Sequence, residues 1–182
     1  RRIAMKSAAI ASAALSFAVS AIPIEGARAQ APAEQPGSNA DSPGITVTID
    51  NFVRAATDFE FSKAVAHAGG VNRFFHLREP TPVDAQTVIR MNRDTLYSTA
   101  IVDISEGATL KLPDTGDRYM STMIVNEDHY INKVFLGGGT YRLDMDTFGT
   151  PYVMVSVRTL VDAADPDDVA AVKALQDQFV IE

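Results

Sequence analysis

The 182-residue chain has a formal net charge of −7, no cysteine, no tryptophan and three histidines. An acidic chain lacks the clustered Lys and Arg that neutralise phosphates, so nucleic-acid binding and attraction to an anionic membrane surface are not expected. Without cysteine there is no disulfide, Cys-ligated zinc or iron–sulfur cluster, and no HExxH motif supplies a histidine site. We therefore expect no metal and no cofactor.

Residues 1–29 have the pattern of a secretory signal peptide. Arg1, Arg2 and Lys6 form a basic region, an apolar run follows, and Ala27-Arg28-Ala29 is an A-x-A cleavage site. The apolar run is shorter than the ~20 residues of a spanning helix, which favours cleavage after Ala29 over a membrane anchor. A periplasmic or secreted protein is predicted, with general secretory and twin-arginine export both open.

The remaining chain divides by composition. Residues 30–45 form a predicted flexible leader, because 30–44 is rich in Pro, Ala, Ser and Gly and has no large apolar side chain. Residues 46–182 form a single domain, long enough to bury its own core. After signal cleavage the chain holds 12 basic and 22 acidic residues, a balance that favours solubility.

A helix is predicted to begin at an Asp50 cap and to end at Gly69-Gly70. Its apolar positions recur near helical spacing at Phe52, Val53, Ala56, Phe59, and Lys63 or Ala64. Prolines at 80 and 82 then break the chain.

The pattern next changes to a period of two. Strands are predicted at 98–104, 110–112, 119–125, 141–143 and 152–159, with a turn at 113–116 and a hairpin bend at 137–139. In the last strand Val153, Val155 and Val157 share a core face, and Tyr152, Met154, Ser156 and Arg158 share the other.

The last predicted element is a helix with its cap at Asp165 and Pro166 in its first turn. Val169, Val172, Leu175 and Phe179 form its apolar face. The predicted fold class is therefore mainly β, an antiparallel β-sandwich or barrel-like domain with an N-terminal and a C-terminal helix.

The first candidate site is the polar segment 87–98. Its arginines, Arg90 and Arg93, together with Asn92, are candidates to bind an anionic or carboxylate group. Asp94 and Tyr97 are candidate catalytic residues that orient or deprotonate a hydroxyl. The alternative is structural: 92–94 forms a turn into a strand, and the charged groups satisfy one another.

The second candidate is His129, the predicted general base, with Asp128 beside it as a ligand-binding residue. Neighbours in a strand point to opposite faces, so Asp128 does not orient His129, and a distant carboxylate such as Asp94 would be needed. The alternative is an ordinary loop histidine. Arg158 is a further candidate ligand contact, although an ion pair with Asp162 or Asp103 is favoured.

The chain resembles the bacterial family known as domain of unknown function 1254 (DUF1254). The resemblance covers about 46–180, and its carriers read NFVRA at 51–55, FFH at 74–76, REPTP at 78–82, VIRMNRDTLYS at 88–98, DHY at 128–130 and RTLVD at 158–162. It implies an exported, mostly β protein, usually followed by a DUF1214 domain. The chain ends at Glu182, where such proteins continue, which suggests C-terminal truncation and a DUF1214-type domain as an associated partner.

Two functions are therefore expected as alternatives. One is an exported domain that binds a small polar or anionic ligand and is hydrolytic together with a second domain. The other is a non-catalytic envelope module that contacts a polymer or protein through exposed Tyr141, Phe148 and Tyr152. A truncated fragment without a function of its own is the third alternative.

Overall fold

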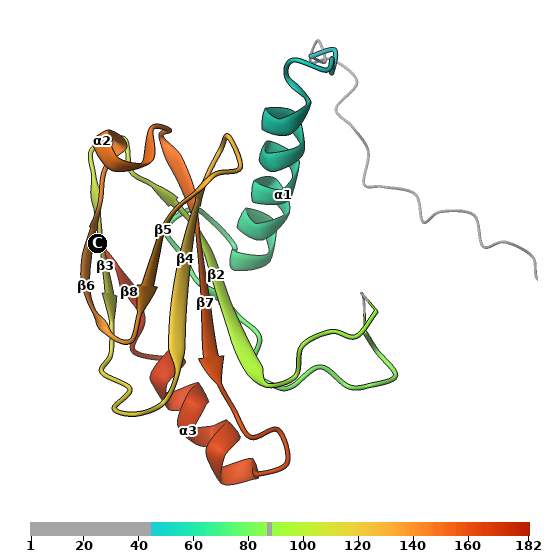
Figure 1. Cartoon of the computed structure of the whole chain (residues 1–182), viewed down its shortest axis with the longest axis vertical. Coiled ribbons are helices and arrows are strands. Elements are labelled where there is room, and N and C mark those ends of the chain that lie inside the picture. The colour runs from blue at the N-terminus through green and yellow to red at the C-terminus, as the bar shows by residue number, and fades with distance from the viewer. Residues whose placement is uncertain (1–44, 87–88) are drawn as a thin grey trace, which may run out of the picture. The chain divides into compact units, whose positions relative to one another are not determined.

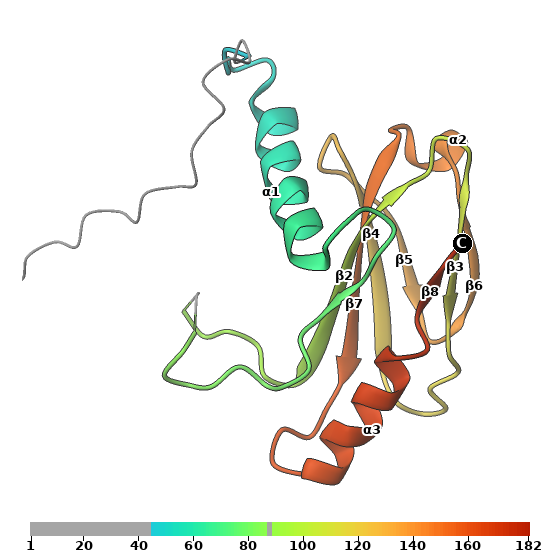
Figure 2. The ribbon, with the colours of Figure 1, turned by 180° about the vertical axis from the view of Figure 1, so that it is seen from behind.

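A computed structural model describes residues 45–86 and 89–182, so the predicted signal peptide and all but the last residue of the predicted leader lie outside the described residues. The described chain forms two packed antiparallel sheets (Figures 1 and 2), which makes the predicted mainly β sandwich correct. One sheet has the order β1 (Phe75–His76), β2 (Thr95–Asp103), β7 (Tyr152–Leu160), β4 (Met120–Asn126) and β5 (Ile131–Leu136). The other has the order β6 (Gly139–Leu143), β3 (Ala108–Leu112) and β8 (Val180–Ile181). The helices are α1 (Phe52–Ala68), α2 (Met145–Phe148) and α3 (Pro166–Gln176).

Strand β7 shows why the sheets pack. Val153, Val155 and Val157 are fully buried between the two sheets, as the sequence predicts. Met154 and Ser156 alternate with them and lie on the outer face of the five-stranded sheet, where they are only half-buried. Because side chains alternate along a strand, a single period-two pattern supplies both the core and the outer surface.

Helix α1 lies against that outer face, chiefly over β2 (Figure 2). Its N-cap is Asn51 and not the predicted Asp50, while Gly69 ends it in the left-handed conformation (φ 72°) as expected. Thr57 and Phe61 are its buried residues. The predicted apolar face instead points away from the sheet, because Phe52 and Phe59 are exposed.

Several strand predictions need correction. Strand β2 begins at Thr95, three residues before the predicted start, and β5 was not predicted. The bend at 137–139 is not a hairpin, since β5 and β6 belong to different sheets. Strand β8 follows α3 and pairs with β3, so α3 is not the last element.

Helix α3 covers one end of the sandwich (Figure 1). The Asp165 side chain accepts a hydrogen bond from the Asp167 amide at 2.9 Å, which confirms the predicted cap. Asp168 forms an ion pair with Arg118, and this contact lowers the pKa of the Asp168 carboxyl to about 2. The helix is thereby fastened to the turn that precedes β4.

The segment around β1 is joined to α3 by a buried polar group. His76 Nδ1 lies 2.7 Å from Ser98 Oγ, and its ring contacts the rings of Phe74 and Phe179. Gln176, which is 1 % exposed, donates to the same Ser98 oxygen at 3.2 Å. Ser98 is also 1 % exposed, so this Ser–His contact is structural and offers no accessible nucleophile.

Gly138 is the position where the chain turns from one sheet to the other, and we expect Gly138→Ala to be destabilising. An added Cβ would lie 2.0 Å from the Pro113 carbonyl oxygen, a backbone atom that has little freedom to move. The expected loss is about 1–3 kcal/mol of unfolding free energy, measured by urea denaturation. Gly137→Asn is the control, because Gly137 (φ 75°) has open space around it and Asn tolerates the left-handed region.

We also expect stability to fall in acid through His76. Burial, followed by the nearby Arg78 charge, lowers the pKa of His76 from 6.5 to about 4, and Asp177 only partly opposes this. The unfolded chain therefore binds the proton more tightly, so stability is complete above pH 6.5 and is lost as the pH falls toward 4. Urea midpoints across this range should decline less steeply in His76→Gln; equal slopes would contradict the assignment.

Candidate functional site

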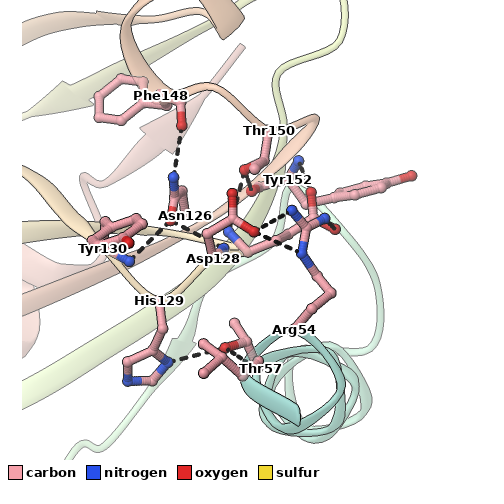
Figure 3. A network of polar contacts seen from close by, with 11 residues as sticks. Arg54, Thr57, Asn126, Asp128, His129, Tyr130, Phe148, Thr150 and Tyr152 are labelled. Atoms are coloured by element: carbon pink, nitrogen blue, oxygen red, sulfur yellow. Dashed lines mark hydrogen bonds and ion pairs between the residues drawn. The ribbon is translucent and has the colours of Figure 1, made fainter. Parts of the chain in front are cut away.

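The candidate site is built on the loop between β4 and β5. Asn126, the last residue of β4, is 4 % exposed, and its amide donates to the Phe148 carbonyl at 2.9 Å. Its side-chain oxygen accepts from the backbone amides of Asp128 and Tyr130 (Figure 3). These contacts hold the loop and place His129 at φ 66°, a conformation that a non-glycine residue seldom adopts without support.

The loop places the His129 ring next to α1. The Thr57 hydroxyl donates its only hydrogen to the Val53 carbonyl at 2.9 Å. The same oxygen lies 3.0 Å from His129 Nδ1 (Figure 3). With the hydroxyl hydrogen directed at Val53, this oxygen accepts from Nδ1, which then carries the ring proton. In the neutral ring, Nε2 therefore keeps its lone pair as an available acceptor or base.

Asp128 serves a different purpose from the one predicted. The Arg54 guanidinium donates to Asp128 Oδ1 through Nε at 3.1 Å and through a terminal nitrogen at 2.5 Å. Arg54 also lies 3.5 Å from Glu127, which accepts from the Tyr152 amide. Asp128 thus ties α1 to the loop, with Arg54 as its hydrogen-bonding partner, and Thr57 is the residue that meets His129 Nδ1.

His129 lines an open groove of about 410 Å³ between α1 and the outer face of the sheet. Thr99 of β2 and Met154 of β7 line its sheet side. The other lining residues come from α1 and β1: Glu60, Lys63, Ala64, His67 and Phe75. Lys63 lies 2.7 Å from the Glu60 carboxylate, so the helix side of the groove presents one positive and one negative side chain that form a salt bridge.

The structure does not bring Asp94 to His129. Strands β2 and β4 are both antiparallel to β7, so they run in the same direction, with Asp94 before one and His129 after the other. The start of β2 is paired with Leu160 and the end of β4 with Val153, so the two strand ends lie seven residues apart along β7, roughly 24 Å. The expected Asp94–His129 pairing is therefore wrong, and Thr57 is the residue that orients the histidine.

The residues before β2 form a turn that leads into the strand. Asn92 Oδ1 accepts from the Asp94 amide at 2.8 Å, and Asn92 Nδ2 donates to Thr95 and, at 3.3 Å, to the Tyr97 hydroxyl. Arg93 is half-buried, whereas Arg90 and Asp94 are exposed. The structural alternative thus describes Asn92 well. Residues 87–88 lie outside the described residues.

Tyr97 and Arg158 are neighbours on the outer face of the sheet. They are paired in the β2–β7 register, and the Arg158 guanidinium lies over the Tyr97 ring, 5.2 Å from its centre. The favoured ion pair is not formed, since Asp103 accepts from Ser105 and Asp162 accepts from the Ala164 amide. Because Tyr97 precedes Thr99 by two positions on the same face of β2, this pair lies about 7 Å beyond the groove.

The three aromatic residues predicted as surface contacts are buried or half-buried against other parts of the protein. Phe148 is 1 % exposed and belongs to the core, so that prediction is wrong. Tyr141 stacks on Phe135 with ring centres 4.0 Å apart and donates to the Gly138 carbonyl. Tyr152 is half-buried beside Phe61 in a second groove, on the side of α1 that faces Ile101.

Sequence reasoning missed Asn126 and Thr57, which position His129. The only local signal for Asn126 is that it is the first polar residue after an apolar strand.

Within residues 45–86 and 89–182, no three His, Asp or Glu side chains are grouped so that they could hold a metal ion. No helix in this part of the chain is long and apolar enough to cross a membrane.

We expect the neutral ring of His129 to carry its proton on Nδ1. Nitrogen-15 NMR of histidine-labelled protein should show this tautomer. Thr57→Val keeps the side-chain shape but removes the acceptor, so the tautomer should shift toward Nε2–H. His67→Gln and His76→Gln identify the other signals; an unchanged His129 tautomer in Thr57→Val would contradict the assigned contact.

Comparison with known proteins gives a family match for the segment that contains the turn into β2. Residues 71–142 match the family model described as "Protein of unknown function (DUF1254)". The matched region includes four of the six segments that carry the resemblance, and 51–55 and 158–162 lie outside it. No curated protein matches the chain.

A solved structure agrees on the fold. The crystal structure of the VPA0106 protein from Vibrio parahaemolyticus superposes with a TM-score of 0.55 at 20 % identity, covering 71 % of this chain. The matched part spans 34 % of that protein, about a third of its length. At this identity the likeness concerns the fold alone. Residues 71–142 are thus similar to the DUF1254 family model, and this match agrees with the motifs from which the sequence predicts a resemblance to that family.

Proposed function

We propose that this domain is an exported module that binds a small polar or anionic ligand in the groove between α1 and the five-stranded sheet. The observation that carries the proposal is the position of His129. Its Nδ1 is committed to Thr57, its backbone is held in an uncommon conformation, and its ring lines the groove. A fixed ring with one available nitrogen is suited to accept a hydrogen bond from a ligand hydroxyl or ammonium group.

The chemistry around His129 suggests which ligands fit. Thr99 provides a hydroxyl and Met154 an apolar surface on the sheet side, and Lys63 contributes positive charge on the helix side. Along β7, Arg158 lies four residues beyond Met154, about 13 Å away. A compact ligand would contact His129, whereas an elongated one with an anionic end would also reach the Arg158 guanidinium.

A hydrolytic function would use the same nitrogen. His129 Nε2 would accept a proton from water as it attacks, and Arg158 would hold negative charge on the substrate. Asp94, Arg90 and Asn92 take no part in this version, because they lie at the opposite end of β2. Conversion with a second, DUF1214-type domain remains part of the proposal, and ligand binding does not depend on it.

The proposed location is periplasmic or secreted. Support comes from residues 1–29 alone, with their basic start, apolar run and A-x-A site. An envelope interaction module is the second candidate function, favoured by the exposed Phe52 and Phe59 on α1.

The test is thermal unfolding of the protein with inorganic phosphate, short dicarboxylates, neutral sugars and sugar phosphates. We expect one class to raise the melting temperature of the wild type. His129→Gln should weaken that ligand at least tenfold, the effect of about 1.4 kcal/mol, because it removes the ring nitrogen. Arg158→Gln should reduce affinity for the anionic members only.

Arg142→Gln is the matched control. Arg142 is an arginine on the other sheet with 70 % of its side chain exposed, so it reports non-specific anion binding. Equal losses in Arg142→Gln and His129→Gln, or no stabilisation by any class, would overturn the proposed site.

A further inference from the structure

Helix α1 borders a groove on each of its two flanks, and the proposed function uses only the groove that contains His129. The second groove has a volume of about 430 Å³. Its helix side is formed by Asp58, Phe61, Ser62 and Val65, which share one face of α1 because they are three or four residues apart. The two grooves have no lining residue in common, so they are separate sites.

The part of the second groove near the end of α1 is lined by apolar side chains. Ile101 of β2 is 2 % exposed and Phe61 is 6 % exposed, and both line the groove from below. Val65 on the helix and Val71 in the segment after it continue the same surface. Such a surface favours the carbon skeleton of a ligand over a fully hydrated ion.

The opposite end of the groove carries two carboxylates. Asp58 lies seven residues before Val65, about 10 Å along the helix axis. Glu127, in the loop after β4, reaches the same end, since it lies 3.5 Å from Arg54, one helical turn before Asp58. The Glu127 side chain is 12 % exposed and accepts from the Tyr152 amide at 3.2 Å. The groove is therefore polarised, with negative charge at one end and an apolar surface at the other.

The single arginine at this end does not balance its acidic groups. Arg54 donates to Asp128 at 2.5 Å (Figure 3) and is shared with Glu127. The hydrogen bond to Asp128 raises the pKa of Arg54 most, against the effect of burial, and the charges of Asp128, Glu127 and Asp58 raise it further. These four side chains are one positive and three negative, a net charge of −2.

The hydrogen-bonding groups on the acidic side are acceptors. The Ser62 hydroxyl donates its hydrogen to the Phe59 carbonyl at 2.7 Å, so its oxygen is left to accept. The carboxylates of Asp58 and Glu127 only accept when ionised. A neutral apolar ligand would take water from these carboxylates without replacing its hydrogen bonds, and an anion would be repelled. A cationic group with N–H donors meets both requirements.

We propose that the second groove binds a primary ammonium compound with an apolar carbon skeleton. The ammonium group donates to the carboxylates of Asp58 and Glu127. The carbon skeleton extends over Ile101 toward Val71. The Tyr152 ring also lines the groove, and an aromatic face attracts a cation, which favours the same ligand class.

Calorimetric titration of the full chain with hexylammonium, hexanol and hexanoate tests the ligand class, because the three probes share a skeleton and differ in charge. Hexylammonium should bind about tenfold more tightly than hexanol, and hexanoate should not bind. Added salt should weaken the binding of hexylammonium. Equal affinities for hexylammonium and hexanol would show an apolar groove without charge selection and overturn the proposal, as would no binding of any probe.

Two variants test the carboxylates. Asp58→Asn and Glu127→Gln keep the side-chain shape and each remove one negative charge, so each should weaken hexylammonium about fivefold. Asp117→Asn is the matched control, because Asp117 is an exposed carboxylate in the turn between β3 and β4. An equal loss in Asp117→Asn would mean that only the net charge of the chain attracts the probe, which contradicts a site in the groove.

Methyl NMR of the wild type locates the probe and stays decisive if a variant fails to fold. Hexylammonium should shift the methyl resonances of Val65, Val71 and Ile101, which line the second groove. Shifts confined to Met154 would place the probe in the His129 groove and overturn the proposal.

Discussion

The alternation of side chains along the central strands governs both the stability and the surface of this domain. On β7, Val153, Val155 and Val157 fill the space between the sheets, and the residues between them face outward. A shift of one residue would place the valines in water and Arg158 in the core, so the register is strongly determined. The position of Arg158 over Tyr97 and the Met154 surface of the groove follow directly from the packing of the core.

A second constraint is the need to satisfy buried polar groups. Asn126 ends a buried strand, and its amide and carbonyl have to find partners inside the protein. It finds them in the Phe148 carbonyl and in the amides of the loop that it encloses. The loop conformation that results turns His129 toward α1. A structural requirement at one residue thus determines the direction of the candidate functional group.

Helix α1 positions the candidate site. Thr57 on its sheet side orients His129, its flank lines the groove, and Phe52 and Phe59 on its outer side are exposed. Its contact with the loop through Arg54 and Asp128 is exposed and therefore adds little stability by itself.

Much of the fold is readable from the sequence because its causes are local. Strand periodicity predicts β3, β4, β6 and β7, and the valines of β7 are correctly placed in the core. The Asp165 cap and Pro166 predict α3, and the motifs between 74 and 98 predict the family. The exposed strand β5 and the sheet-to-sheet passage at Gly138 were missed, because neither has a distinctive local pattern.

The site depended on tertiary structure. Sequence alone identified His129, Tyr97 and Arg158 as candidates, yet the grouping of His129 with Asp94 was wrong, because strand order decides which strand ends meet. The orienting partner, Thr57, lies 72 positions away in sequence, on a helix whose apolar stripe predicts the wrong face toward the sheet. Composition and periodicity determined the core and the caps, and the resemblance to the family rested on the motifs. Only the packing of α1 against the sheet decided which side chains share a groove, because that contact joins segments whose patterns carry no information about each other.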